Sequence, residues 1–146
     1  MIPSTILYFA RGSAISIVTV LLVDDHQFFR RFVRSFLGTL GNVSVVGEAS
    51  NGIEAVELAE TLHPDVVLMD ISMPLRNGID AARIIKQRLP STKVWILSMH
   101  DNPVYRQESQ DARVDGYVLK SDLKANLVTV FQDALLGNEK SRAKPV

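Results

Sequence analysis

The sequence predicts an α/β fold in which helices cover both faces of a five-stranded parallel sheet. From residue 16 onward, short apolar runs alternate with stretches of helical periodicity. Most of these runs are apolar at nearly every position, which is typical of strands buried on both faces. Strands that alternate with helices form a doubly wound sheet, and right-handed crossovers leave few ways to connect them.

The first strand and the first helix are predicted between residues 16 and 41. Ser16 to Val23 is rich in β-branched residues and ends in an unbroken apolar run. An amphipathic helix follows, and Gly41 with Asn42 ends it. Its apolar positions have helical spacing: Phe29, Phe32, Val33, Phe36, Leu37 and Leu40. We expect Phe28 to belong to the core together with the phenylalanines of this helix.

The middle of the chain is predicted to form two further strand–helix pairs. Val43 to Ala49 is the second strand, and the helix after it stops at Pro64. The apolar face of that helix consists of Ala55, Leu58, Ala59 and Leu62. Asp65 to Asp70 is a third strand, because it is too short and too uniformly apolar for a surface helix. Asn77 to Leu89 forms the third helix, which ends at Pro90.

The last part of the chain completes the alternating pattern. Lys93 to Ser98 is the fourth strand, and Pro103 to Ala112 is a weak, polar helix. Gly116 to Lys120 is a short fifth strand. A final helix from Leu123 to Leu136 carries a regular apolar face.

We divide the chain into three segments. Residues 1–15 are an N-terminal extension of unknown role; Arg11 and Gly12 interrupt its apolar stretch, and no basic residue precedes it, which argues against a signal peptide. Residues 16–136 form the α/β domain. Residues 137–146 are a polar tail or the start of a linker.

The composition excludes several classes of function. The 16 basic and 16 acidic residues cancel, and no basic stripe suited to nucleic acid is visible. The chain has no cysteine, which excludes disulfides, thiol catalysis and thiolate zinc sites and is compatible with a reducing cytoplasm. No apolar stretch approaches the length of a membrane span.

Charged and polar residues stand at the carboxyl ends of four predicted strands. Asp24 and Asp25 follow the first strand, Asp70 ends the third, Ser98 the fourth and Lys120 the fifth. In a doubly wound sheet, ligands bind at this edge. We therefore expect three carboxylates, a hydroxyl and an ammonium group to converge there.

Such a cluster has a definite chemistry. Two carboxylates about 4–5 Å apart repel by roughly 3–4 kcal/mol at an effective dielectric constant near 20, so the cluster either raises pKa values or binds a cation. Oxygen ligands alone favour a hard ion, Mg²⁺ or Mn²⁺. A carboxylate beside such an ion can attack phosphorus and form an acyl phosphate, with Lys120 and Ser98 contacting the transferring oxygens.

Four segments carry a resemblance to a known family. They are VLLVDDHQ at 20–27, VVLMDISMP at 66–74 with NGID at 77–80, ILSMHDNP at 96–103, and GYVLKSDL at 116–123. Together they resemble the receiver domains of two-component response regulators, most closely those of NarL/FixJ-type transcriptional regulators, over about residues 18 to 136. The resemblance identifies residues 16–136 as a receiver domain and implies a flavodoxin-like sheet with strand order 2-1-3-4-5.

The resemblance also implies a role for individual residues. Asp70 corresponds to the phosphoacceptor and Asp25 to a direct metal ligand, with Asp24 beside it acting directly or through water. The backbone carbonyl of Ser72 corresponds to the third protein ligand of the Mg²⁺ or Mn²⁺ ion.

Three further residues correspond to the rest of the family's machinery. Lys120 corresponds to the lysine that assists phosphoryl transfer, Ser98 to the switch hydroxyl, and Tyr117 to the rotating aromatic residue that reports the engagement of Ser98.

The function implied by this resemblance is a phosphorylation switch. A sensor histidine kinase would phosphorylate Asp70, and the changed conformation would control an output. That output would be transcription, through a DNA-binding domain that this chain lacks. Phosphorylated copies can form a homodimer. We expect no enzyme activity beyond self-phosphorylation from a phosphodonor and slow autodephosphorylation, no membrane association, no nucleic-acid binding by this chain alone, and a cytoplasmic location.

The sequence departs from the family in two places. Ser121 stands where a cis proline often follows the lysine, and a cis bond before a non-proline residue costs about 2.5–4 kcal/mol. The fourth helix lacks the usual Ala-Leu-x-x-Gly-Ala pattern, which should weaken it. Its residues there are Ser109, Gln110, Arg113 and Val114.

The same residues are compatible with alternatives to a receiver that controls transcription. A complete single-domain receiver would pass or sequester phosphoryl groups without an output domain. A phosphohydrolase of the haloacid-dehalogenase kind would use Asp70 as nucleophile, but its second acid is expected where Ser72 stands. A nucleotide-binding domain is excluded because no glycine-rich phosphate motif follows any strand.

Overall fold

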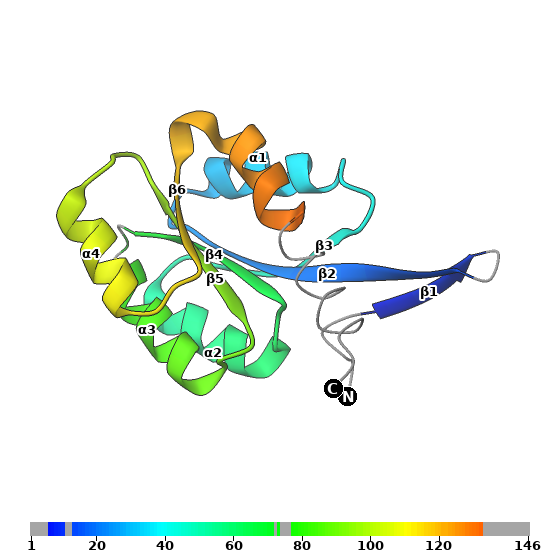
Figure 1. Cartoon of the computed structure of the whole chain (residues 1–146), viewed down its shortest axis with the longest axis horizontal. Coiled ribbons are helices and arrows are strands. Elements are labelled where there is room, and N and C mark those ends of the chain that lie inside the picture. Colours follow the sequence, from blue (N-terminus) through cyan, green and yellow to red (C-terminus); the bar gives the residue numbers. More distant parts are fainter. Residues whose placement is uncertain (1–5, 11–12, 72, 74–76, 133–146) are drawn as a thin grey trace, which may run out of the picture.

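The sheet has the predicted parallel core. The computed structural model describes residues 6–10, 13–71, 73 and 77–132. Its strands are β1 (Ile6–Ala10), β2 (Ser13–Val23), β3 (Val43–Ala49), β4 (Val66–Asp70), β5 (Lys93–Ser98) and β6 (Gly116–Leu119). Five of them run parallel in the order β3-β2-β4-β5-β6, which confirms the predicted order 2-1-3-4-5 (Figure 1).

Helices cover both faces of this sheet. They are α1 (Gln27–Leu37), α2 (Gly52–Leu62), α3 (Gly78–Arg88), α4 (Pro103–Asp111), a 3₁₀ turn (Lys120–Asp122) and a helix over residues 123–132. The helix at 123–132 lies with α1 on one face, while α2 and α3 lie on the other (Figure 1). Among the described residues, no helix combines the length and apolar character needed to cross a membrane.

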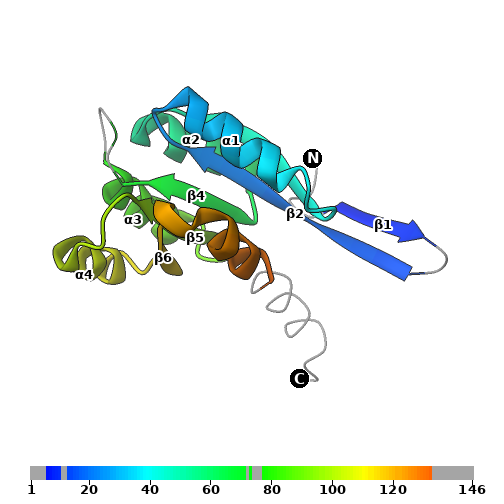
Figure 2. The same ribbon diagram turned by 90° about the horizontal axis from the view of Figure 1, so that it is seen from above.

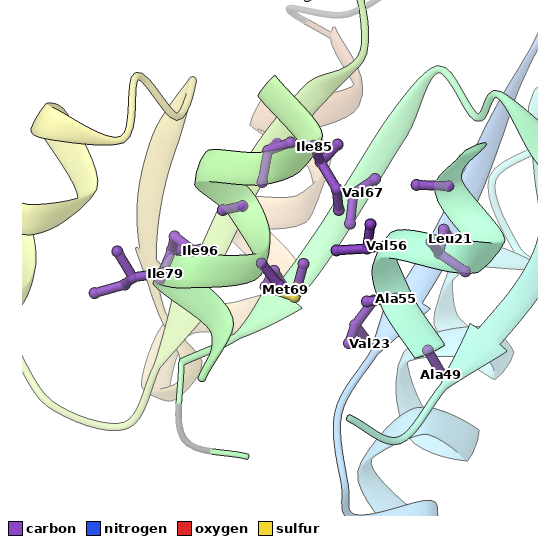
Figure 3. Packing of buried hydrophobic residues seen from close by; sticks show 14 of the residues in the cluster. Leu21, Val23, Ala49, Ala55, Val56, Val67, Met69, Ile79, Ile85 and Ile96 are labelled. Atoms are coloured by element: carbon purple, nitrogen blue, oxygen red, sulfur yellow. The ribbon is translucent and has the colours of Figure 1, made fainter. Parts of the chain in front are cut away.

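Alternating residues of each central strand pack into two separate cores, one on each face of the sheet. In β2, Val20 and Leu22 pack beneath α1, whereas Leu21 and Val23 pack beneath α2 and α3. Figure 3 shows the second of these clusters, in which Met69 of β4 lies between the helices and the sheet. Complete burial of one such side chain stabilises the fold by about 1.5–3 kcal/mol, so these two cores hold the strand ends in place.

An antiparallel strand precedes the parallel core, and the sequence did not predict it. β1 pairs with the first residues of β2, with Ile6 opposite Ile17 and Ala10 opposite Ser13. The resulting hairpin extends beyond the helices (Figures 1 and 2). β2 therefore begins at Ser13, three residues before the predicted start.

Helix α1 departs from two expectations. It ends at Leu37 rather than near Gly41, and a turn covers the residues between. The expectation that all four phenylalanines belong to the core is wrong for two of them, since Phe28 is 85% exposed and Phe32 is 46% exposed. The reason is geometric: only a narrow stripe of α1 meets the sheet, and Val33 and Leu37 fill it.

Helix α4 forms despite its unusual sequence. The side chain of Asn102 accepts hydrogen bonds from the backbone N–H groups of Val104 and Tyr105, which caps the first turn. Ser109 is the one buried residue of this helix, and its hydroxyl donates to the carbonyl of Tyr105 at 2.7 Å. Arg113, where the family has glycine, adopts a left-handed conformation with φ of 64°. The described residues contain no cis peptide bond.

Candidate functional site

Asp24 and Asp70 lie at the same edge of the sheet because of the register between β2 and β4. Val23 is paired with Met69, and the residues that follow them are Asp24 and Asp70. Both aspartates are buried, with 2% of Asp24 and 4% of Asp70 exposed. Buried carboxylates are unstable without compensation, so a positive group must accompany them.

Lys120 provides that positive group. Its ammonium nitrogen donates to Asp24 Oδ2 at 2.8 Å and lies 3.1 Å from Asp70 Oδ1. The lysine side chain is only 8% exposed, so this is a buried three-residue ion cluster. The cluster brings together groups from the ends of β2, β4 and β6, as the sequence predicts.

Several other groups fix the position of Asp24. Its Oδ1 accepts a hydrogen bond from the backbone N–H of His26 at 2.8 Å. The guanidinium of Arg30 donates to its backbone carbonyl at 2.6 Å and is itself paired with Glu48. Asp24 is therefore held at both its backbone and its side chain.

Asp25 lies at the solvent side of the same site. Its side chain is 32% exposed, and its Oδ1 is 3.0 Å from His26 Nδ1. Ligand atoms of Asp24, Asp25 and His26 all lie within 4.8 Å of one another. Such a group can hold a cation, and Asp70 adjoins it through the shared contact with Lys120.

The electrostatics of Asp70 fit a cation site. Burial raises the pKa of Asp70 above its usual value, and the negative charge of Asp24 raises it further. Lys120 opposes these effects through its charge and hydrogen bond, while Asp25 adds to them weakly. The ionised form of Asp70 thus lacks sufficient positive charge nearby, and a divalent cation held by oxygen donors would supply it.

A glycine allows the helix α3 to approach Asp70 closely. A Cβ atom at Gly78 would lie 1.9 Å from the carbonyl oxygen of Asp70. The backbone N–H of Gly78 also donates to the carbonyl of Ile71 at 3.1 Å. Any side chain at Gly78 would therefore displace the backbone that carries Asp70.

Ser98 at the end of β5 and Tyr117 in β6 both bond to the loop after β5. The Ser98 hydroxyl donates to the backbone carbonyl of His100 at 2.9 Å, and the Tyr117 hydroxyl donates to the same oxygen at 2.9 Å. The guanidinium of Arg106 lies 4.6 Å from the centre of the Tyr117 ring. The two hydroxyls are thus joined through one acceptor, His100, which the sequence did not single out.

The structure therefore gathers most of the predicted residues. Asp24 and Asp70 each contact Lys120 directly, and Asp25 adjoins Asp24 through His26. Ser72, predicted to offer its backbone carbonyl, lies outside the described residues.

Sequence reasoning missed His26, Arg30 and Phe29. The ring of Phe29 lies 4.1 Å from Lys120 Nζ, measured to its centre. All three follow the Asp24-Asp25 pair within one and a half turns of helix. That short distance along the sequence was the signal from which their place near the site could have been predicted.

Comparison with known proteins finds relatives over most of this chain. The profile described as the response regulator receiver domain matches residues 20–132. The transcriptional regulatory protein DegU of Brevibacillus brevis is 42% identical over 103 residues, which are 70% of this chain and 44% of DegU. The response regulator protein VraR of Staphylococcus aureus is 42% identical over 106 residues, 71% of this chain and 50% of VraR.

Solved structures share the fold. A LuxR-family two-component response regulator from Aurantimonas sp. superimposes with a TM-score of 0.78 at 34% identity, covering 84% of this chain and 87% of that one. The receiver domain of NarL from Mycobacterium tuberculosis gives a TM-score of 0.77 at 34% identity, covering 83% and 98%. The chain spans about half the length of the curated relatives it matches.

Proposed function

The chain belongs to the family of response regulator receiver domains, of the NarL/FixJ type, and we propose that its Asp70 accepts a phosphoryl group from a partner histidine kinase. The observation that supports this most directly is the buried cluster in which Lys120 contacts both Asp24 and Asp70. Burial raises the pKa of Asp70, which stands at the end of the central strand β4. Added positive charge would therefore stabilise its ionised form.

The transfer is a displacement at phosphorus. An oxygen of Asp70 forms the new bond while the bond from phosphorus to the imidazole nitrogen of the partner breaks, and the imidazole leaves with that electron pair. The product on this chain is an acyl phosphate. Lys120 Nζ, 3.1 Å from Asp70 Oδ1, is placed to donate to the oxygens of the arriving group.

The carboxylates of Asp24, Asp25 and Asp70 and the carbonyl of Ser72 are the groups proposed to hold Mg²⁺ or Mn²⁺. When bound, the ion supplies the positive charge that the phosphoryl oxygens and the ionised carboxylates require. The oxygen-rich donor set and the raised pKa of Asp70 both fit this role.

The switch residues respond to the new charge. An acyl phosphate offers the Ser98 hydroxyl an ionised acceptor, and hydrogen bonds to ionised groups are roughly twice as strong as neutral ones. When Ser98 turns toward it, the carbonyl of His100 loses one of its two donors, and Tyr117, which donates to the same oxygen, would rotate in response. A difference of a few kcal/mol between the two arrangements is enough to shift the population.

The relatives support a proposal for the output and the partners. DegU is named a transcriptional regulatory protein, and a similar solved structure is titled a DNA-binding response regulator. We propose the same use here, in the cytoplasm, with transcription controlled through a DNA-binding domain outside this chain and with a homodimer formed on phosphorylation. A single-domain shuttle or sink for phosphoryl groups is the alternative, and it would transfer its phosphoryl group onward to a second phosphoacceptor.

The proposal is tested with a small phosphodonor. Incubation with acetyl phosphate and Mg²⁺ should add one phosphoryl group to the intact mass, and omission of Mg²⁺ should prevent it. Asp70→Asn should take up none while keeping its circular dichroism spectrum. An unchanged mass of the unsubstituted protein would refute the proposal.

A further inference from the structure

The ammonium group of Lys120 has an aromatic neighbour besides its two carboxylates. Lys120 Nζ lies 4.1 Å from the centre of the Phe29 ring, well inside the range of a cation–π interaction. Asp24 and Asp70 contact the same nitrogen at 2.8 and 3.1 Å. The lysine side chain is 8% exposed, and its ammonium group contacts two carboxylates and one ring face.

The position of Phe29 follows from the start of α1. The helix begins at Gln27, one residue beyond the Asp24-Asp25 pair, and Phe29 is in its first turn. The side chain is half-buried and packs against the core on this face of the sheet. Its ring can therefore contact Lys120 without leaving the core.

The two carboxylates that contact Lys120 have further roles in the proposed reaction, whereas the ring of Phe29 has none. Asp24 and Asp70 are both proposed to contact the cation, and Asp70 also becomes phosphorylated. The ring of Phe29 takes part in neither event. Lysine has a flexible four-carbon stem, so its ammonium group needs an additional contact to stay in place once a carboxylate is engaged elsewhere.

We propose that Phe29 is a positioning residue for phosphoryl transfer, holding the Lys120 ammonium beside Asp70 through its ring face. This inference rests on the proposed function of Asp70. The interaction is shielded from water, and cation–π contacts are strongest when they are desolvated. Phe29 thus acts through Lys120 and contacts neither the phosphodonor nor the cation.

The test compares a variant that removes the ring with one that keeps it. Phe29→Leu should lower the maximal rate of phosphorylation by acetyl phosphate, at saturating Mg²⁺, about 3- to 30-fold. Phe29→Tyr should stay within about twofold of the unsubstituted rate, because the ring face remains. Equal rates for the leucine and tyrosine variants would overturn the role of the ring.

A matched control comes from the same helix. Phe36 is also half-buried against this core, but its ring faces Lys124 at 5.8 Å. Phe36→Leu makes the same chemical change and should leave the phosphorylation rate unaltered. A loss equal to that of Phe29→Leu would mean that core packing, not the contact with Lys120, sets the rate, and would overturn the inference.

Nuclear magnetic resonance supplies a readout independent of phosphorylation. The ε-methylene protons of Lys120 should be shifted upfield by the ring current of Phe29, and the shift should persist in Phe29→Tyr and vanish in Phe29→Leu. Absence of the shift in the unsubstituted protein would overturn the contact itself. If the shift is present but the unsubstituted protein takes up no phosphoryl group, it is the proposed function of Asp70 that fails.

Discussion

Ser98 and Tyr117 donate hydrogen bonds to one and the same oxygen, the backbone carbonyl of His100, each at 2.9 Å. A carbonyl oxygen has two lone pairs, so it can accept both bonds at once. The backbone N–H of His100 lies 3.2 Å from Ser98 Oγ, which ties the loop to Ser98 a second time. The two residues, on neighbouring strands β5 and β6, are therefore coupled through one peptide group.

The first prediction separates the two hydroxyls. Ser98→Ala should slow phosphorylation by acetyl phosphate roughly ten- to 100-fold, because it removes a donor to the transferring oxygens. Tyr117→Phe removes the other bond to His100 but no donor to phosphorus, and its rate should stay within about twofold of the unsubstituted rate. The time course of the intact mass measures both. If the two variants lose the same fraction of the phosphorylation rate, Ser98 and Tyr117 do not have separate roles.

The second prediction concerns stability and pH. Burial and the charge of Asp24 raise the pKa of Asp70 in the folded protein, so the ionised carboxylate weakens the fold. This penalty is absent below the pKa of the unfolded chain and grows as the pH rises through the folded-state pKa. Without divalent cations, Asp70→Asn should therefore melt higher than the unsubstituted protein at neutral pH, and the difference should shrink in acid. A lower melting temperature for the variant at neutral pH would contradict the argument.

The third prediction concerns the cation. A ligand that binds only the folded state stabilises it by about 2.7 kcal/mol at 100 times its dissociation constant, so millimolar Mg²⁺ should raise the melting temperature. Asp25→Asn should reduce that rise. Glu57→Gln, which removes an exposed charge from α2, is the matched control and should preserve it. If Mg²⁺ raises the melting temperature equally in both variants, the ion binds at a site that does not include Asp25.

The fourth prediction concerns the strained residue after α4. A left-handed conformation costs a residue with a Cβ atom about 1–2 kcal/mol, and glycine avoids most of this at some entropic cost in the unfolded chain. Arg113→Gly should therefore stabilise the protein by about 0.5–1 kcal/mol in chemical denaturation. Arg113→Ala removes the same charge but keeps Cβ, and should bring no such gain. If the alanine variant gains as much, the benefit comes from the lost charge and not from φ.

Much of the fold was predictable because its signals are local. The strands over 43–49 and 93–98 have the predicted bounds, since β-branched apolar runs and flanking turns specify them within a few residues. The order of the parallel strands, which the family resemblance implied, was also correct. Convergence of the aspartates then followed from the rule that parallel strands place their carboxyl ends at one edge.

The remaining features depend on contacts between distant segments. Helical spacing predicted an apolar face for α1, but the width of the core on that side leaves Phe28 and Phe32 exposed. The direction of the Ser98 hydroxyl depends on the path of the loop through His100, which no strand pattern encodes. Pairing of β1 with β2 depends likewise on a hairpin that lies outside the alternating pattern.

The identity of the modified carboxylate is the most direct test of the whole account. After treatment with acetyl phosphate and Mg²⁺, reduction with borohydride converts an aspartyl phosphate to homoserine, and peptide mapping then locates the residue. We expect homoserine at position 70 alone, dependent on Mg²⁺. Homoserine at position 24 or 25, or at no position, would contradict it.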